Sequence, residues 1–513
     1  MPYLSGKEFQ GEEGRRVLLA LQMLESGEFF VPKLFEELYF NKPPLFNWAL
    51  ALLFKLTNDY SEFTARTLSV LAVIFTGLFL TYLWMNLIPT KSFLINLLPG
   101  LIFMTIPEVI DKALRAEIDA FYTMIITLGL FSWFYLSEIR QKKRLAFLVS
   151  GLFFGLGVLT KTFHALIFFY FAMVPYLLFQ KRLGELRSFT HFLWFLGVFL
   201  SCLIWFLPVS LKIGLKPFIS SWIAEYRSAA RGDEMTLWQH LESYTIHAVV
   251  GFSPWIFTLF FLKSRAFISF LRENTSLRSL LVFSLALFLS SYVFHFLFPG
   301  ARLRYTLPSI SGLAFVSAIG FFYLFIQKSI LRSSLVLQRI MPLTFIGLSF
   351  IFLLYLHKIN YKPEIPFYFL YIFFILLNLY ILLTKEFSFR RYFLYLVFLV
   401  FLLKHLYITF YYNFHQREMN YFRKASFEIA SLIQPKRELY LCKVIPHHLL
   451  YYMKYRYKLI DNIHHLKTCE SLPLDKNILF LRKDLPQELN YQYKTIPLKI
   501  RTKEYVIIST TKN

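Results

Sequence analysis

Long apolar segments dominate this chain of 513 residues, 57% of which are hydrophobic and 20% aromatic. About twelve segments, each of roughly 16 to 20 residues, lie near 68–87, 92–109, 119–137, 145–160, 163–179, 191–210, 246–262, 279–298, 307–326, 339–356, 366–384 and 390–409. A helix of about 20 apolar residues crosses the hydrocarbon core of a bilayer. The sequence therefore predicts a polytopic α-helical membrane protein and excludes a soluble globular one.

The connectors between these segments alternate in charge. Those on one side carry about eighteen Lys and Arg residues, and those on the other side carry about seven. Because strongly basic loops stay in the cytoplasm, we expect residues 1–66, the loop 211–245 and the tail from about 410 on the outer side. The net charge of +24 follows from this topology and does not indicate a nucleic-acid partner.

An even number of segments places both ends of the given sequence on the outer side. Nothing in Met1–Gln10 has the features of a signal peptide or a membrane span. Two explanations stay open: the first segment inserts with its start outside, or a further helix precedes the given sequence. We expect the upstream helix.

Composition divides the chain into three parts. Residues 1–66 form a first external loop with juxtamembrane helices, 67–409 a transmembrane domain, and 410–513 a soluble external domain. The last part alternates β-like runs (Glu438–Val444, Asn477–Arg482, Glu504–Ser509) with helical stretches near 418–433 and 445–455. This alternation predicts a small α/β domain.

Three cysteines exclude a disulfide-rich scaffold. Cys202 lies in an apolar segment, where we expect an inert buried thiol. Cys442 and Cys469 lie in the polar tail and are able to pair in an oxidising compartment.

The polar first loop holds two groups of residues with chemical potential. The adjacent carboxylates of Glu12 and Glu13 can supply a general base and a partner that orients it; a solvated acidic pair is the alternative. Lys42 precedes Pro43 and Pro44, which stiffen the backbone and fix the direction of a phosphate-binding lysine. The alternative is a helix-entry turn, because proline also favours the first helical turn.

Further ionisable residues fall at the outer ends of the apolar segments, where a charge must face a cavity or a partner rather than lipid. Asp119 opens one segment and either serves a site or pairs with Arg115 at helical i,i+4 spacing. Lys161, in a very short outer turn, either reaches the membrane interface or binds phosphate.

Two outer loops add candidates. Arg302 and Arg304 beside Tyr305 fit a phosphate clamp, with an interfacial anchor as the alternative. The longest connector, 211–245, contains Arg227, Arg231, Asp233, Glu234, His240 and Tyr244, and long loops often carry function. No spacing in this loop matches a metal motif, so we expect His240 to be a bystander or a hydrogen-bonding residue rather than a metal ligand.

The order of these residues resembles one known family. Glu12-Glu13-x-Arg15, Met23, Ser26-Gly27, Val31-Pro32, Tyr39, Lys42-Pro43-Pro44-Leu45, Trp48, Glu62 and Arg66 form a string. This string is similar to the first external loop of GT-C glycosyltransferases of the dolichyl-phosphate-mannose protein mannosyltransferase type. The likeness is greatest for the bacterial branch that contains the lipid A aminoarabinose transferase. Later landmarks are Arg115 with Asp119, Leu159-Thr160-Lys161, Trp205, Pro254-Trp255 and Tyr305-Thr306-Leu307-Pro308. Members of this branch have thirteen spans and a soluble C-terminal domain, which agrees with twelve segments plus an upstream helix.

The resemblance implies roles for individual residues. The family's catalytic aspartate falls on Glu12 and the following glutamate on Glu13, while Asp119 takes the second acidic motif. By the resemblance, Lys42, Lys161 and Arg304 take the roles of donor-phosphate ligands and Tyr305 that of a substrate contact. Beside the resemblance, we expect Arg302 to bind the phosphate as well, and Arg15, Arg115 and His240 to contact the substrate. Asn41 stands where this branch has an acidic residue, so the sequence gives no support to a metal site there.

The activity that the resemblance implies is that of an inverting glycosyltransferase in the bacterial inner membrane. Its donor would be a polyprenyl-phosphate sugar, and its acceptor a hydroxyl of a lipid, glycan or protein at the outer face. A transporter or flippase of a lipid-linked sugar would show mid-span polar residues and internal repeats, and the sequence shows neither. Glutamate in place of aspartate at position 12 keeps an inactive, binding member as a third reading.

Overall fold

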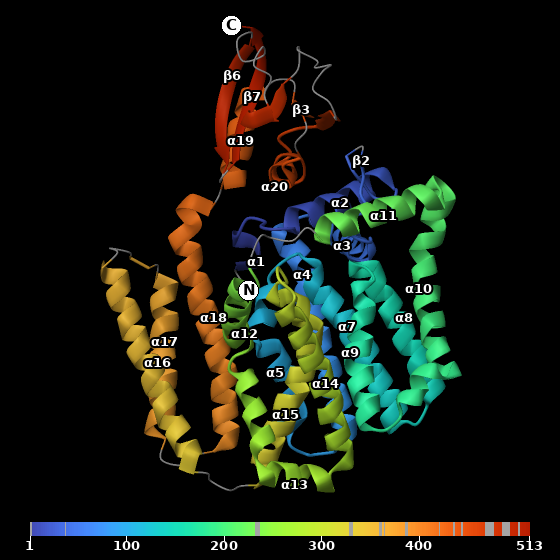
Figure 1. Cartoon of the computed structure of the whole chain (residues 1–513). Coiled ribbons are helices and arrows are strands. Elements are labelled where there is room, and N and C mark those ends of the chain that lie inside the picture. Colours follow the sequence, from blue (N-terminus) through green and yellow to red (C-terminus); the bar gives the residue numbers. More distant parts are fainter. Residues whose placement is uncertain are drawn as a thin grey trace. The chain divides into compact units, whose positions relative to one another are not determined.

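The computed structural model describes residues 3–35, 37–230, 236–327, 332–358, 362–363, 365–384, 388–419, 421–433, 437–442, 445–466, 477–484, 493–500 and 503–512. The chain forms two compact units. The terminal unit contains residues 1–40, 46–68 and 415–513, and the central unit contains residues 41–45 and 69–414. Figure 1 labels the helices and strands of both units.

Nine helical segments within the described ranges are long and apolar enough to cross a membrane. They are α4 (Glu62–Leu87), α7 (Ile118–Phe134) with the π-helix η1 (Tyr135–Ile139), α8 (Lys143–Lys161), α10 (Phe189–Ile213), α14 (Thr275–Leu297), η4 (Leu303–Ser309) with α15 (Ile310–Gln327), α16 (Arg332–Lys358), α17 (Ile365–Leu383) and α18 (Phe389–Met419). Each coincides with one of the apolar segments that the sequence predicts. The chain is thus an α-helical multi-span membrane protein, as expected.

Two further predicted segments are bent helix pairs. The helices α5 (Phe93–Thr105) and α6 (Pro107–Ala113) meet at 67°, and α12 (Leu237–Phe252) and η3 (Trp255–Lys263) meet at 97°. In both cases a proline follows the break, and the residue before a proline is driven out of the helical region. Ile106 and Ser253 accordingly have extended backbones, with ψ of 123° and 149°. Counting each pair as one span gives up to eleven spans.

The twelfth predicted segment, 163–179, is the shorter helix α9 (His164–Phe179). At about 1.5 Å per residue its 16 residues are about 24 Å long, less than the hydrocarbon core of about 30 Å. The expected count of about twelve spans is therefore higher than the nine to eleven of the described structure. The remaining elements of the central unit are η2 (Leu183–Arg187), α11 (Leu215–Ala230) and α13 (Arg265–Glu273).

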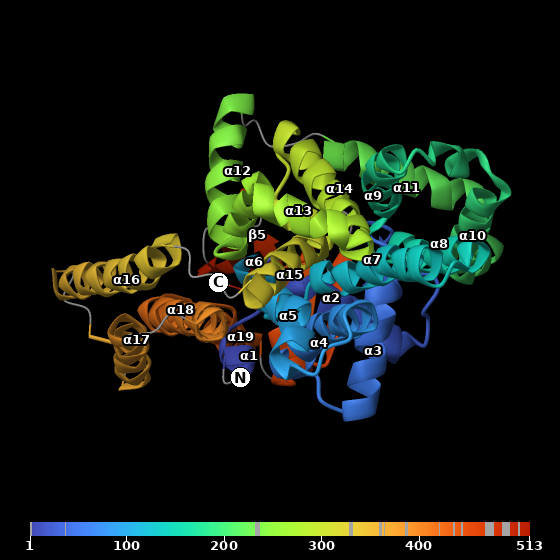
Figure 2. The same ribbon diagram turned by 90° about the horizontal axis from the view of Figure 1, so that it is seen from below.

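Small residues bring α8 and α10 together, and the two helices lie side by side in Figures 1 and 2. Gly151 and Gly155 are four residues apart on one face of α8. A Cβ atom added to Gly151 would lie 2.1 Å from the carbonyl oxygen of Trp194. Only glycine allows the two backbones to approach this closely.

The terminal unit combines segments from both ends of the chain. Its N-terminal part holds α1 (Tyr3–Gly6), α2 (Glu13–Ser26), the antiparallel pair β1 (Lys33–Leu34) and β2 (Glu37–Leu38), and α3 (Leu45–Thr57). Its C-terminal part holds α19 (Tyr421–Ile433), β3 (Glu438–Cys442), α20 (His447–Leu450), η5 (Tyr451–Arg456), β4 (Asn462–Leu466), β5 (Ile478–Leu481), η6 (Arg482–Asp484), β6 (Tyr493–Ile500) and β7 (Lys503–Lys512). The small α/β region predicted for the tail is confirmed.

The sheet has the strand order β4-β3-β5-β7-β6. β3 pairs in parallel with β4 and β5, whereas β7 pairs antiparallel with β5 and β6. Along β3 the fully buried Leu439 and Leu441 alternate with the half-buried Glu438 and Tyr440. A strand with one covered face requires this alternation. Cys442, at the end of β3, is disulfide-bonded, and Cys202 is a buried free thiol. Cys469, the partner expected from the sequence, lies outside the described residues.

Candidate active site

Asp119 and Lys161 form the closest ion pair of the central unit's candidate residues. Asp119 lies in the first turn of α7, and Lys161 is the last residue of α8, which packs along α7. The Lys161 Nζ atom lies 2.6 Å from Asp119 Oδ1, with side-chain exposures of 12% and 4%. Each charge also suits its helix end, because the helix dipole favours an anion at the start and a cation at the end. Lys161 thus lies at a fixed position, as phosphate binding requires.

Arg304 reaches the same carboxylate from η4. Its Nη1 atom lies 3.7 Å from Asp119 Oδ2 and 3.4 Å from Glu117 Oε2. Burial, and then repulsion from Asp119, raises the pKa of the Glu117 carboxyl, although nearby cations oppose this effect. Two basic side chains, Lys161 and Arg304, thus converge on the Asp119 carboxylate. The arrangement is therefore suited to an anion that can take the place of the carboxylates.

Two tyrosines complete this group. The Lys161 ammonium lies 5.1 Å from the ring centroid of Tyr122 and 5.0 Å from that of Tyr305. The Arg304 guanidinium lies 5.8 Å from the Tyr305 centroid. Aromatic faces attract cations at these distances, so Tyr305 keeps both basic groups close together. We call Asp119, Glu117, Lys161, Arg304 and Tyr305 the ion cluster.

A pair of histidines adjoins the ion cluster. The Nε2 atoms of His164 and His295 are 3.3 Å apart, and the His295 ring is 6.2 Å from that of Tyr305. His295 Nδ1 lies 2.8 Å from the Ser291 carbonyl oxygen, so Nδ1 carries the proton and Nε2 accepts from His164. Lys42, half-buried, is close enough to His164 to act on it electrostatically. His164 is a site residue that the sequence reasoning missed, although it follows Lys161 by only three positions.

Three other expected residues have different surroundings. Arg115 Nε pairs with Asp111 Oδ2 at 3.3 Å, so the expected alternative of an Arg115–Asp119 pair is wrong. The reason is that α6 ends at Ala113, and residues 115 and 119 therefore do not share a helix. Arg302 is exposed at the start of η4. His240 is 3% exposed, and its Nε2 atom lies 3.1 Å from the His295 carbonyl oxygen, which fits the expected hydrogen bond.

The described residues contain no group of three or more His, Cys, Asp or Glu side chains that could hold a metal ion. Of the loop 211–245, residues 231–235, with Arg231, Asp233 and Glu234, lie outside the described residues, as does the side chain of Arg227.

In the terminal unit the two adjacent carboxylates have different environments. Glu12 precedes α2 and is 38% exposed, and its Oε2 atom lies 3.0 Å from Arg15 Nη1 and 3.3 Å from Arg16 Nη2. Glu13 is 2% exposed and pairs with Arg66 through both oxygens, at 2.8 and 3.1 Å. Glu12 can therefore meet a substrate, whereas Glu13 is committed to Arg66.

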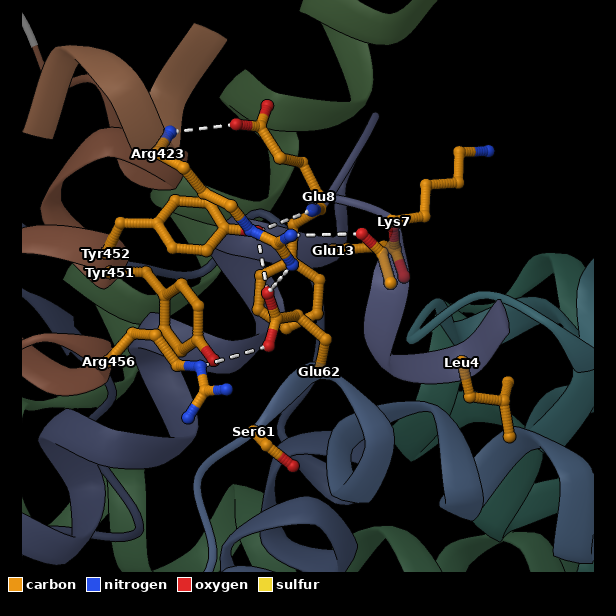
Figure 3. Close-up of polar contacts among 12 residues, drawn as sticks. Leu4, Lys7, Glu8, Glu13, Ser61, Glu62, Arg423, Tyr451, Tyr452 and Arg456 are labelled. Carbon is orange, nitrogen blue, oxygen red and sulfur yellow. Dashed lines mark hydrogen bonds and ion pairs between the residues drawn. The ribbon is translucent and has the colours of Figure 1, made fainter. Parts of the chain in front are cut away.

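Glu13 belongs to a buried charge network (Figure 3). Arg66 also donates hydrogen bonds to the carbonyl oxygens of Leu4, Lys7 and Glu8, at 2.6, 2.9 and 3.1 Å. Glu62, one turn before Arg66 on α4, is fully buried.

Glu62 accepts hydrogen bonds from the Arg423 guanidinium and from the Tyr452 hydroxyl at 3.1 Å, and it pairs with Arg456 at 3.3 Å. These three partners come from α19 and η5 in the C-terminal part of the unit. The network thus links the start of α4 to α2 through Arg66 and to the C-terminal part of the unit through Glu62.

Together these observations describe a multi-span α-helical membrane protein with a cluster of charged side chains at the ends of its helices. Comparison with known proteins supports this class. Residues 41–211 match the family described as dolichyl-phosphate-mannose-protein mannosyltransferase. The crystal structure of ArnT from Cupriavidus metallidurans in the apo state has the same fold, with a TM-score of 0.69 at 16% identity, covering 99% of this chain and 95% of that chain. The structure of the same protein bound to undecaprenyl phosphate gives a TM-score of 0.65 at 15% identity.

Sequence relatives point in the same direction. The chain is 30% identical over 218 residues to the undecaprenyl phosphate-alpha-4-amino-4-deoxy-L-arabinose arabinosyl transferase of Pseudomonas savastanoi pv. phaseolicola, covering 41% of this chain and 39% of the relative. The transferase of the same name from Yersinia enterocolitica is 27% identical over 327 residues, covering 62% of this chain and 56% of the relative. The chain thus spans about two fifths to a little over half of the length of these relatives in the alignments. The resemblance predicted from the sequence is confirmed.

Proposed function

We propose that this protein is an inverting glycosyltransferase that takes its sugar from a polyprenyl phosphate and transfers it to a hydroxyl of a lipid, glycan or protein. The observation that carries the proposal is the ion cluster, in which Lys161 and Arg304 converge on Asp119. The likeness to transferases that use undecaprenyl phosphate supports the same conclusion. An undecaprenyl-phosphate-linked amino pentose is the first donor to test.

The proposed chemistry needs positive charge at the leaving group. The bond between the sugar C1 atom and a phosphate oxygen breaks, and its electrons pass to that oxygen. The phosphodiester with one negative charge becomes a monoester with up to two. Lys161 and Arg304 interact more strongly with the second state than with the first, so they lower the barrier rather than merely bind the donor. Lys42 and Arg302 are proposed as further phosphate ligands.

Glu12 is the proposed general base. The acceptor oxygen attacks C1 from the side opposite the phosphate, which inverts the anomeric centre, and its proton passes to the Glu12 carboxylate. The accessibility of Glu12 supports this choice over Glu13, which Arg66 occupies on both oxygens. Arg15 is proposed to orient Glu12 and to contact the substrate, and Tyr305 to contact the donor. Asp119 is proposed to position Lys161.

The proposed location is the bacterial inner membrane, with residues 1–66 and 410–513 outside the cytoplasm and 67–409 as the transmembrane domain. Loop charges support this orientation. The disulfide at Cys442 supports it independently, because disulfides persist in oxidising compartments.

The test uses purified protein in nanodiscs and a panel of polyprenyl-phosphate sugars, with release of polyprenyl phosphate as the signal. We expect release by the wild type, and a loss of 100-fold or more in Glu12→Gln and in Lys161→Met, because one charged group of this kind contributes about 10²–10³ in rate. Glu428→Gln and Lys142→Met, at exposed positions, are the matched controls.

Release that survives Glu12→Gln would assign the base to another carboxylate. No release with any donor, together with movement of the intact donor across a vesicle membrane, would replace the transferase with a flippase. The absence of both release and movement would indicate an inactive binding protein.

A further inference from the structure

A short helix from the tail packs directly on the helix that follows Glu12. A Cβ atom added to Gly14 of α2 would lie 2.8 Å from the His448 ring and 3.2 Å from the His448 Cα atom. Glycine at position 14 therefore allows α20 to approach α2 at backbone distance. His448 in turn stacks on Phe422 of α19, with ring centroids 4.9 Å apart, and Leu449 and Leu450 are fully buried. These contacts hold α20 in place against α2.

The neighbouring residue, His447, contacts the proposed catalytic machinery. Arg15 Nε donates a hydrogen bond to His447 Nε2 at 3.1 Å, while Arg15 Nη1 pairs with Glu12 Oε2 at 3.0 Å. One guanidinium therefore bridges a histidine of the tail and the carboxylate of Glu12. Because Nε2 accepts this bond, the neutral ring carries its proton on Nδ1.

The histidine is suited to remain an acceptor. Burial, and then the charge of Arg15, lowers the pKa of His447 to about 3. The ring is therefore neutral throughout the physiological range, and its Nε2 lone pair stays available to Arg15. A protonated histidine would repel the guanidinium, whereas a neutral one holds it.

The hydrogen bond matters because an arginine side chain has four rotatable bonds. Without an acceptor at Nε, the Arg15 guanidinium can rotate away from Glu12. Arg16 Nη2, 3.3 Å from the same Oε2 atom, then remains as a partner of Glu12. The carboxylate would keep a positive neighbour and lose the contact with the Arg15 guanidinium.

We propose that His447 is a positioning residue for catalysis, supplied by the C-terminal tail, which holds Arg15 so that the Glu12 carboxylate faces the acceptor hydroxyl. The proposal rests on the function of Glu12 given above. By this proposal the tail takes part in catalysis. It provides the hydrogen-bond acceptor for Arg15, and it provides the surface against which α2 packs.

The activity test compares three substitutions in the full chain. In His447→Gln the side-chain amide oxygen can reach the position of Nε2, whereas in His447→Asn it reaches only the position of Nδ1. We expect His447→Ala and His447→Asn to lower kcat by 10- to 100-fold, with the donor KM changed by less than threefold. His447→Gln is expected to recover most of the lost rate. A general loss of folding would not follow this pattern.

A double-mutant cycle shows whether His447 acts through Arg15. If it does, His447→Ala has no further effect on kcat in an Arg15→Met background. Thermal unfolding of the same four proteins tests the Arg15–His447 contact independently of enzyme activity.

Equal rates for His447→Ala and His447→Gln, or additive effects with Arg15→Met in either cycle, would overturn the proposal. Unchanged activity of Glu12→Gln in the same assay would instead refute the proposed base and leave the Arg15–His447 contact intact.

Discussion

Substitution of Arg66 by methionine should strongly destabilise the terminal unit. Arg66 is 1% exposed and makes five hydrogen bonds, two to Glu13 and three to the carbonyl oxygens of Leu4, Lys7 and Glu8. Methionine has a similar length but donates none of these bonds. It would leave the buried Glu13 carboxylate without its cation and three carbonyl oxygens without their donor.

The expected cost is about 3–5 kcal/mol, because removal of one partner from a buried ion pair leaves an uncompensated charge. Glu13→Gln alone should cost less, since glutamine remains polar and still accepts one bond. The double variant Arg66→Met/Glu13→Gln should be more stable than the sum of the single effects predicts, by about 1–3 kcal/mol for groups in direct contact.

Denaturant unfolding in nanodiscs, followed by pulse proteolysis of the N-terminal segment, would measure these differences. Asp461→Asn is the matched control, because it breaks an exposed pair with Arg437 whose side chains are 63% and 41% exposed. Such pairs contribute about 0–1 kcal/mol. A cost below about 1 kcal/mol for Arg66→Met, or strictly additive single and double variants, would refute the argument that the network holds α2 in place.

Three further predictions concern the site and the tail. Lys161→Met should weaken binding of polyprenyl phosphate by tenfold or more in a titration, while the exposed Lys142→Met should bind as the wild type does; equal affinities would refute the phosphate role. Because the pKa of folded His447 is about 3 and that of an unfolded histidine about 6.5, its contribution to stability is present above pH 6.5 and is lost as the pH falls toward 3. The loss is at most about 2 kcal/mol at pH 5. Between pH 7 and pH 5, His447→Gln should lose less stability than the wild type, as measured by thermal unfolding at the two pH values. Identical losses in the two proteins would contradict the lowered pKa of His447. Cys442→Ser should destabilise the sheet region by about 2–5 kcal/mol, measured as protease sensitivity of the tail; unchanged sensitivity would contradict a stabilising disulfide.

The membrane helices were predictable because hydropathy alone decides which segments enter a bilayer. All twelve apolar segments coincide with helices of the structure. The breaks at Pro107 and Pro254 were missed, since an average over about twenty residues does not register a single proline, although the residue before each proline carries the signal. In the tail, two strands were missed. Asn462–Leu466 (β4) lacks an apolar alternation, and β6 contains Pro497, which argues against a strand in the sequence.

The candidate residues could be picked out from the sequence, but the contacts that the structure gives them could not. Asp119 and Lys161 stand out in the sequence as charges at the ends of two neighbouring apolar segments, and the structure pairs them. The pairing of Arg115 with Asp119 failed because the i,i+4 rule holds only within a continuous helix. The different environments of Glu12 and Glu13 depend on Arg66, 53 positions away from Glu13, and on His447, 432 positions away from Arg15. Such contacts arise from tertiary packing and leave no local pattern in the sequence.

The central claim is that the protein transfers a sugar and releases polyprenyl phosphate. The most direct measurement is the ratio of polyprenyl phosphate released to sugar bound by an acceptor, followed over time in nanodiscs. The account predicts a ratio of one to one that depends on the acceptor and disappears in Lys161→Met. Movement of the donor across a vesicle membrane with the bond between its sugar and phosphate intact would contradict the account.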